Sequence, residues 1–187
     1  NRCVQWDLLQ YPEHKGMNSL CKALNHLYHN EKALHELDDK PEGFGWLNAI
    51  SANDCYLTYM RKGSKPEDIL VVVANFAGVE QSIRTGVPYE GKYKEIFNTD
   101  DKEFGGKGII NKKVISAEDI RWDDKDQSIE VKMAPLSLSI LRFQPYTEEE
   151  LEKVIADRIR KRTIITSKEK AEKKSKTTKT KSMKEKK

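Results

Sequence analysis

The sequence contains few cysteines and no long apolar run. Cysteine occurs at Cys3, Cys21 and Cys55, without a CxxC pair. Zinc sites and disulfide frameworks need closely spaced or paired cysteines, so neither is expected, and buried free thiols in a reducing cytoplasm are predicted instead. No stretch of about 18 apolar residues occurs, which excludes a single apolar helix that spans a bilayer.

The sequence also lacks the short motifs of hydrolases, metalloproteases and nucleotide-binding enzymes, because GxSxG, HExxH and GxxxxGK[ST] are all absent. His26 and His29 have a spacing that metal ligands can use, but no carboxylate partner set lies nearby, which favours surface or packing roles. The adjacent acids Asp38-Asp39, Asp100-Asp101 and Asp123-Asp124 lie in turn-like contexts and are expected to be solvated rather than a glycosidase pair. These residues therefore predict neither a catalytic set nor a metal site.

Positive charge is concentrated at the end of the chain. Residues 147–187 hold 15 basic and 8 acidic side chains, a net charge of +7, whereas residues 1–146 hold 19 basic and 22 acidic ones, a net charge of −3. The body is therefore not expected to bind nucleic acid. A basic tail can contact RNA, anionic lipid or an acidic partner, but its interspersed acids and lack of aromatic residues favour a solvated extension, disordered beyond Thr166.

Helical periodicity is clearest between residues 11 and 30. One amphipathic helix is predicted there, and its apolar stripe needs a second layer, either the segment that follows or part of a longer chain. A short second helix is predicted over Glu31–Leu37, and a third after Tyr146, where Thr147 is a candidate N-cap followed by acidic residues. The predicted stripe of the first helix consists of Met17, Leu20, Leu24, Leu27 and Tyr28.

From Gly43 onward the apolar period changes to two, and short alternating segments are separated by turn signals. Seven such segments predict a mainly β fold, an antiparallel β-sandwich with Greek-key connections. The glycine-containing stretch 99–111 is expected to be a long surface loop. The predicted strands are Phe44–Ile50, Cys55–Arg61, Ile69–Phe76, Gln81–Gly86, Tyr93–Asn98, Ser128–Met133 and Leu138–Phe143.

Aromatic residues gather at the start of this β-segment. Phe44 and Trp46 open the first predicted strand, and Tyr56 and Tyr59 lie in the next one. A partly exposed indole offers a flat surface for the apolar face of a glucose ring. Trp46 and Phe44 are therefore the candidate carbohydrate-binding residues, and the alternative is that Trp46 packs against the preceding helix.

An ordered set of short motifs resembles the bacterial glycogen (1,4-α-glucan) branching enzymes of the α-amylase superfamily. Each motif is unspecific alone, but their order over residues 1–145 matches the family's order. The tail after Tyr146 is not part of the family pattern. The motifs are Trp6-Asp7-Leu8-Leu9-Gln10-Tyr11-Pro12-Glu13-His14, Leu24-Asn25-His26-Leu27-Tyr28, Lys32-Ala33-Leu34-His35-Glu36-Leu37-Asp38, Pro41-Glu42-Gly43-Phe44-Gly45-Trp46, Val73-Ala74-Asn75-Phe76, Gly86-Val87-Pro88, Asn98-Thr99-Asp100, Phe104-Gly105-Gly106 and Pro135-Leu136.

The resemblance implies an N-terminal β-sandwich, a (β/α)₈ catalytic barrel and a C-terminal β-domain. Such enzymes cleave an α-1,4 glucan, hold it covalently on an aspartate, and pass it to a 6-hydroxyl to form an α-1,6 branch. Their catalytic motifs match no position of this chain. The implied organisation is the end of the barrel in residues 1–37, the all-β domain in 38–146, and a helix with a disordered Lys-rich tail in 147–187.

The resemblance further implies a cytoplasmic protein without cofactor whose partners are α-glucan, as glycogen or amylose, and an upstream catalytic barrel of the same chain. The first residue is Asn rather than Met, which fits a longer functional unit. Two alternatives remain: the C-terminal domain of another amylase-type hydrolase or amylosucrase-like transglycosylase, and a stand-alone carbohydrate-binding β-module with a basic tail.

Overall fold

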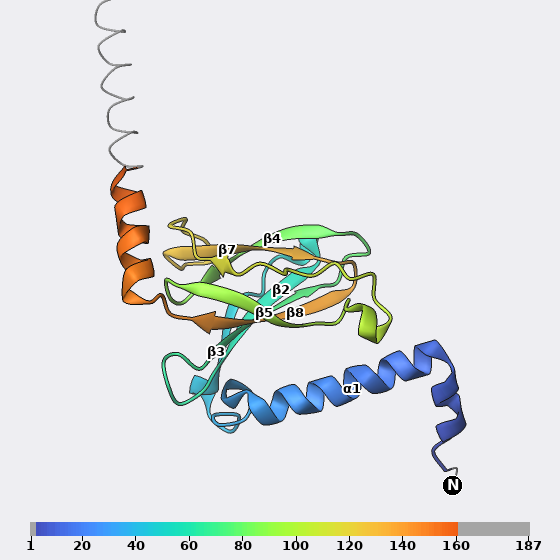
Figure 1. The fold of residues 1–187 in the computed structure, drawn as a ribbon. Coiled ribbons are helices and arrows are strands. Elements are labelled where there is room, and N and C mark those ends of the chain that lie inside the picture. Colours follow the sequence, from blue (N-terminus) through green and yellow to red (C-terminus); the bar gives the residue numbers. More distant parts are fainter. Residues whose placement is uncertain (1–2, 161–187) are drawn as a thin grey trace, which may run out of the picture. The chain divides into compact units, whose positions relative to one another are not determined.

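The structure is a computed structural model that describes residues 3–160 (Figure 1). The chain divides between Pro145 and Tyr146 into two units. In the first unit a six-stranded antiparallel sheet, ordered β1-β2-β3-β8-β5-β6, faces the two-stranded sheet β4-β7. The strands are β1 (Phe44–Asn48), β2 (Tyr56–Lys62), β3 (Ile69–Asn75), β4 (Gln81–Val87), β5 (Lys92–Asn98), β6 (Ile115–Ser116), β7 (Gln127–Met133) and β8 (Ser137–Gln144).

The predicted sandwich is confirmed, and its connections cross between the two sheets. The chain leaves the large sheet after β3, returns to it at β5, and leaves it again for β7. The last strand, β8, then inserts between β3 and β5, antiparallel to both. Inside the sandwich, the hydroxyls of Thr58 and Thr85 lie 2.8 Å apart and join the two sheets by a buried hydrogen bond.

The central strand β3 is buried at every residue because both of its faces are covered. Val71 and Val73 point into the core between the sheets, where they meet side chains of β4 and β7. Leu70 and Val72 point the other way, into a second cluster beneath a helix. This two-sided burial explains why the strand is a continuous apolar run and not an alternating one.

The helix α1 (Pro12–Asn30) covers the outer face of the large sheet (Figure 1). Pro12 occupies the first helical turn, where its missing N–H has no partner to lose. Leu20, Ala23 and Leu27 pack against the cluster around Leu70. Leu20 and Leu27 belong to the predicted stripe, so the sheet covers one edge of that stripe. Its other members, Met17, Leu24 and Tyr28, lie along the same side of the helix but stay exposed.

The predicted helix over Glu31–Leu37 is wrong in its extent. Only a short 3₁₀ turn, η2 (Lys32–Leu34), forms, and turns follow it. Glu31 has extended backbone angles, φ −98° and ψ 102°, which end α1. Its buried carboxylate pairs with Arg142 of β8, so the chain must turn here to bring Glu31 onto the sheet.

The cysteines are not buried as predicted, because all three are free and exposed. Cys21 lies on α1 between Met17 and Leu24, on the face that does not meet the sheet. Cys55 ends a 3₁₀ turn with left-handed backbone angles, φ 53° and ψ 42°. The number and spacing of the cysteines favoured buried thiols, but the position of each cysteine in the fold leaves its side chain exposed.

The stretch 99–111 is a loop, as predicted, apart from the short 3₁₀ turn η5 (Lys102–Phe104). The Asp100 carboxylate organises it by accepting hydrogen bonds from the backbone N–H groups of Lys107, at 3.1 Å, and Ile109, at 2.8 Å. This loop passes close to α1, and a Cβ on Gly16 would lie 2.7 Å from the carbonyl oxygen of Phe104. The absence of a side chain at Gly16 therefore permits the close approach.

The β7–β8 turn holds a leucine in an unfavourable backbone conformation. Leu136 has φ +49° and is 73% exposed. Left-handed angles cost an L-residue roughly 1–2 kcal/mol, and the exposed side chain gains little in return. We expect Leu136→Gly to raise the free energy of unfolding by about 0.5–1 kcal/mol in urea titration. The control Ile50→Gly, at an exposed residue without positive φ, should lower it; equal effects of both changes would disprove the backbone explanation.

In the second unit, residues 148–160 form a helix, and the predicted N-cap is confirmed. The Thr147 hydroxyl accepts the Glu150 N–H at 3.3 Å, and the Glu150 carboxylate accepts the Thr147 N–H at 3.0 Å. This reciprocal pair is a capping box. The disorder expected beyond Thr166 lies outside the described residues. Within residues 3–160, no helix combines the length and apolarity needed to cross a bilayer.

Candidate carbohydrate-binding site

Three aromatic side chains share the outer face of the large sheet at its β1 edge. Phe44 and Trp46 are two residues apart on β1, so they point to the same side. Tyr59 of β2 is the cross-strand partner of Trp46 and joins them there. After Trp46 the strand has an irregularity that sends both Leu47 and Asn48 inward. Trp46 is thus the last outward-facing residue of β1.

The rings of this aromatic cluster (Phe44, Trp46 and Tyr59) brace one another. Phe44 meets Trp46 edge to face, with centroids 5.0 Å apart and planes at 89°, and Tyr59 meets Trp46 at 6.1 Å and 76°. Phe44 and Tyr59 are 5.4 Å apart. Trp46 is still 56% exposed, and Phe44 37%. The cluster therefore presents a supported indole to solvent, which is the geometry that stacks on a sugar ring.

Polar groups border the aromatic cluster on one side. Arg61 lies directly opposite Phe44 in the β1–β2 register. Its guanidinium bonds to the Asp38 carboxylate and, at 3.2 Å, to the Leu34 carbonyl oxygen. Burial raises the pKa of Tyr59, against the opposing charge of Arg61, so its phenol is neutral at physiological pH. Charged donors and acceptors next to an aromatic surface suit a ligand with hydroxyl groups.

The structure brings together the two predicted residues, Phe44 and Trp46, and adds Tyr59, Arg61 and Asp38. The alternative in which Trp46 packs against the preceding helix gains no support, because the side chain is 56% exposed and its ring contacts are with Phe44 and Tyr59. Tyr56 does not join the cluster, since it packs against the inner core and its hydroxyl lies near Asn48. Glucan binding at Trp46 itself stays a prediction.

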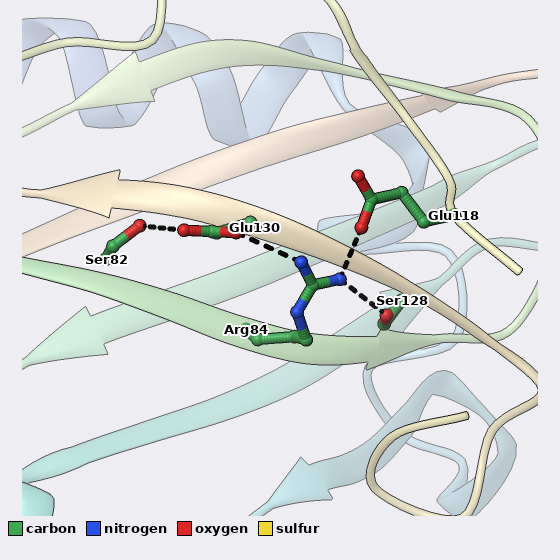
Figure 2. Close-up of polar contacts among 5 residues, drawn as sticks. All are labelled: Ser82, Arg84, Glu118, Ser128 and Glu130. Carbon is green, nitrogen blue, oxygen red and sulfur yellow. Dashed lines mark hydrogen bonds and ion pairs between the residues drawn. The ribbon is translucent and has the colours of Figure 1, made fainter. Parts of the chain in front are cut away.

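A second polar cluster lies on the outer face of the small sheet (Figure 2). Arg84 on β4 pairs with Glu118 at 2.6 Å and with Glu130 of β7 at 3.0 Å, and it donates to the Ser128 hydroxyl. Ser82 donates to the other oxygen of Glu130 at 2.5 Å. The Ser82 hydrogen bond and the Arg84 charge lower the pKa of Glu130 below 4.5. The acids raise the pKa of Arg84. Every member has a protein partner, so this cluster is structural.

The ion pair Arg84–Glu130 should contribute little to stability, and only at a pH where Glu130 is ionised. In a double-mutant cycle with Arg84→Met and Glu130→Gln, we expect a coupling energy of about 0.5 kcal/mol at neutral pH, because the pair is exposed. Since the folded pKa of Glu130 is lowered, its contribution is complete above about pH 4.5 and is lost as the pH falls below that value. Urea titrations at neutral pH and at an acidic pH well below 4.5 measure the coupling energy. A coupling energy that is unchanged in acid would refute the ion-pair assignment.

A shallow apolar groove of about 410 Å³ lies where the N-terminal segment meets α1. Trp6 and Met17 line it together with the exposed Cys21. The groove continues the exposed face of α1 that carries Leu24 and Tyr28. This end of the molecule therefore offers an open apolar surface.

Comparison with known proteins assigns the family. Residues 46–144, just over half of the chain, match the model of the alpha amylase C-terminal all-beta domain. The chain is 37% identical over 142 residues to a 1,4-alpha-glucan branching enzyme GlgB of Oceanobacillus iheyensis, and 39% identical over 142 residues to that of Aquifex aeolicus. Each alignment covers 75% of this chain and 22% of the relative. Against that of Rubrobacter xylanophilus, the identity is 37% over 143 residues, 76% of this chain and 20% of the relative.

The chain thus spans about a fifth of the length of the curated relatives it matches. Its matched region coincides with the sandwich, from the middle of β1 to the end of β8. Sequence match and architecture agree, and the chain belongs to the family of alpha-amylase C-terminal all-beta domains.

Proposed function

We propose that this chain is the C-terminal part of a 1,4-α-glucan branching enzyme, which cleaves an α-1,4 glucan and transfers the released chain to a 6-hydroxyl, forming an α-1,6 branch in glycogen. The observation that carries the proposal is the identity of 37–39% over three quarters of the chain to relatives with that name. The reacting carboxylates are expected in the part of such an enzyme that this chain does not span. This part acts by packing and by holding substrate.

The packing role rests on the open face of α1. Met17, Leu24 and Tyr28 form one exposed apolar face there, and the groove beside Trp6 extends it. Contiguous apolar surface of this kind marks an interaction site. Its proposed occupant is the catalytic barrel of the same enzyme, because residues 1–37 resemble the end of that barrel and precede the matched domain.

The substrate role rests on the aromatic cluster. The glucan is proposed to stack one glucose ring on Trp46, while Arg61 and Asp38 bond its hydroxyl groups. The surface is preformed, because Phe44 and Tyr59 fix the indole, so little side-chain entropy is lost on binding. Glycogen and amylose both present the required sugar face. The proposed compartment is the cytoplasm, where the three free thiols would stay reduced.

A chimera tests this function. Residues 3–145 would replace the matching C-terminal region of the Aquifex aeolicus branching enzyme, and the iodine absorbance of amylose would report branching. We expect the chimera to branch amylose and the same enzyme without the region to be inactive or insoluble. A second chimera with Met17→Ser, Leu24→Ser and Tyr28→Ser should fail as the deletion does. A folded first chimera without branching activity would contradict the proposal.

A stand-alone carbohydrate-binding module is the second candidate. It is favoured by the sandwich's own core, which is closed between the two sheets without help from any other chain. It predicts that the isolated chain is soluble and binds amylose, yet that no chimera restores branching. The two candidates share the aromatic cluster and differ only in what the face of α1 contacts.

A further inference from the structure

The helix at residues 148–160 lies beyond the region that the family shares. The family match ends at Gln144, and the chain forms a separate unit from Tyr146 onward. The helix begins at a capping box of its own, between Thr147 and Glu150. The start of the helix is therefore fixed by its own residues. Any function of the helix would be additional to that of the amylase-type domain.

One face of this helix is apolar and open to solvent. Leu151, Ile155 and Ile159 follow one another at intervals of four residues and are 41%, 46% and 61% exposed. Val154 lies beside them and is partly exposed. Residues at this spacing share one side of a helix. A short helix in water is marginally stable, and burial of such a face is the usual source of its stability.

The charges of the helix are arranged as mirror images about Ile155. Glu152 and Arg158 lie three positions from Ile155 on either side, and Glu150 and Arg160 lie five positions away. In each pair the charges are opposite. Lys153 and Asp157, two positions from Ile155 on either side, form a further pair of opposite charges. The apolar residues Leu151 and Ile159 mirror each other without a change of character.

We propose that the occupant of this face is the same helix of a second copy of the chain, antiparallel to the first, with the two-fold axis at Ile155. In this arrangement the acidic first half of each helix lies alongside the basic second half of its partner, and Ile155 meets Ile155. A parallel pair would place acid beside acid and base beside base. The two helix dipoles also oppose each other favourably only in the antiparallel pair.

The dipole of a single helix already favours acids at its start and bases at its end. That preference explains the charge gradient but not the exposed apolar face, and the proposal accounts for both. The face has only four apolar residues, so the buried area falls well short of the roughly 1,200–2,000 Å² of a stable interface. The association is therefore weak and depends on the charges, with a dissociation constant in the micromolar range or above.

Sedimentation equilibrium of the full 187-residue chain tests the proposal, in buffer at about 50 mM and about 500 mM salt. We expect a concentration-dependent shift from monomer to dimer that weakens at least threefold at the higher salt. Ile155→Lys, which places two ammonium groups on the axis, should weaken the dimer at least tenfold. The matched control Ala156→Lys adds the same charge beside the stripe and should change it less than threefold. Both positions are exposed and lysine favours helix, so circular dichroism should show an unchanged fold.

Each other outcome overturns the proposal. A chain that stays monomeric up to millimolar concentration has no such interface. A dimer that Ile155→Lys leaves intact forms elsewhere, and the exposed face of α1 would then be its source. A dimer that strengthens with salt is held against charge repulsion, which contradicts the antiparallel pairing.

Discussion

Replacement of Asn75 by leucine is expected to lower the free energy of unfolding by about 3–4 kcal/mol. Asn75 ends β3 and is 1% exposed. Its amide nitrogen donates to the carbonyl oxygens of Val79, at 3.0 Å, and Ala134, at 2.8 Å, and its amide oxygen accepts the Ala77 N–H at 2.9 Å. Leucine fills a similar volume but leaves three backbone groups without a partner.

These three bonds join the β3–β4 turn to the end of β7, so their loss affects both sheets. Urea titration monitored by circular dichroism measures the change. Asn53→Leu is the matched control, because Asn53 is exposed on a surface turn, and it should alter stability by less than about 0.5 kcal/mol. An Asn75 variant as stable as that control would mean that the buried amide does not hold the turn.

Replacement of Trp46 by alanine is expected to weaken binding of amylose by at least tenfold, about 1.4 kcal/mol, while the stability of the fold hardly changes. The expected loss is that of the stacking surface, since Phe44 and Tyr59 support the indole but cannot replace it. Stability is preserved because Trp46 lies outside the core. Affinity electrophoresis of the full chain in gels that contain amylose measures the retardation.

Trp122 provides the control for this change. It is also a partly exposed tryptophan, but it sits on the turn before β7 and not in the aromatic cluster. Trp122→Ala should keep the retardation of the unchanged chain. Equal loss in both variants would indicate a nonspecific effect of tryptophan removal, and no loss in either would remove the aromatic cluster as the binding surface.

The sequence was informative where one residue's environment follows from its near neighbours. The seven main strands follow from alternation, or for β3 from a continuous apolar run, and from the turn residues between them; the placement of Phe44 and Trp46 on one face follows from the two-residue repeat. The strand β6 has only two residues, Ile115 and Ser116, too few for an alternation.

Contacts between distant segments could not be predicted in the same way. Arg61 and Asp38 border the aromatic cluster because the chain turns at Glu31 and returns over β2 after η2. How much of the apolar stripe of α1 is covered depends on where the sheet meets the helix, which no period in the sequence records. The exposure of Cys21 follows from the same geometry, since it lies on the face that the sheet leaves open.

The most direct measurement is a titration of the full chain with maltoheptaose, followed through the indole N–H signals of its tryptophans by NMR. The chain has three tryptophans, of which Trp6 and Trp122 serve as internal controls. We expect the Trp46 signal to shift with increasing sugar while the other two stay in place. Cellohexaose, a β-linked glucan, should shift it less. A Trp46 signal that does not move while the sugar binds elsewhere would contradict the assignment of this surface to α-glucan.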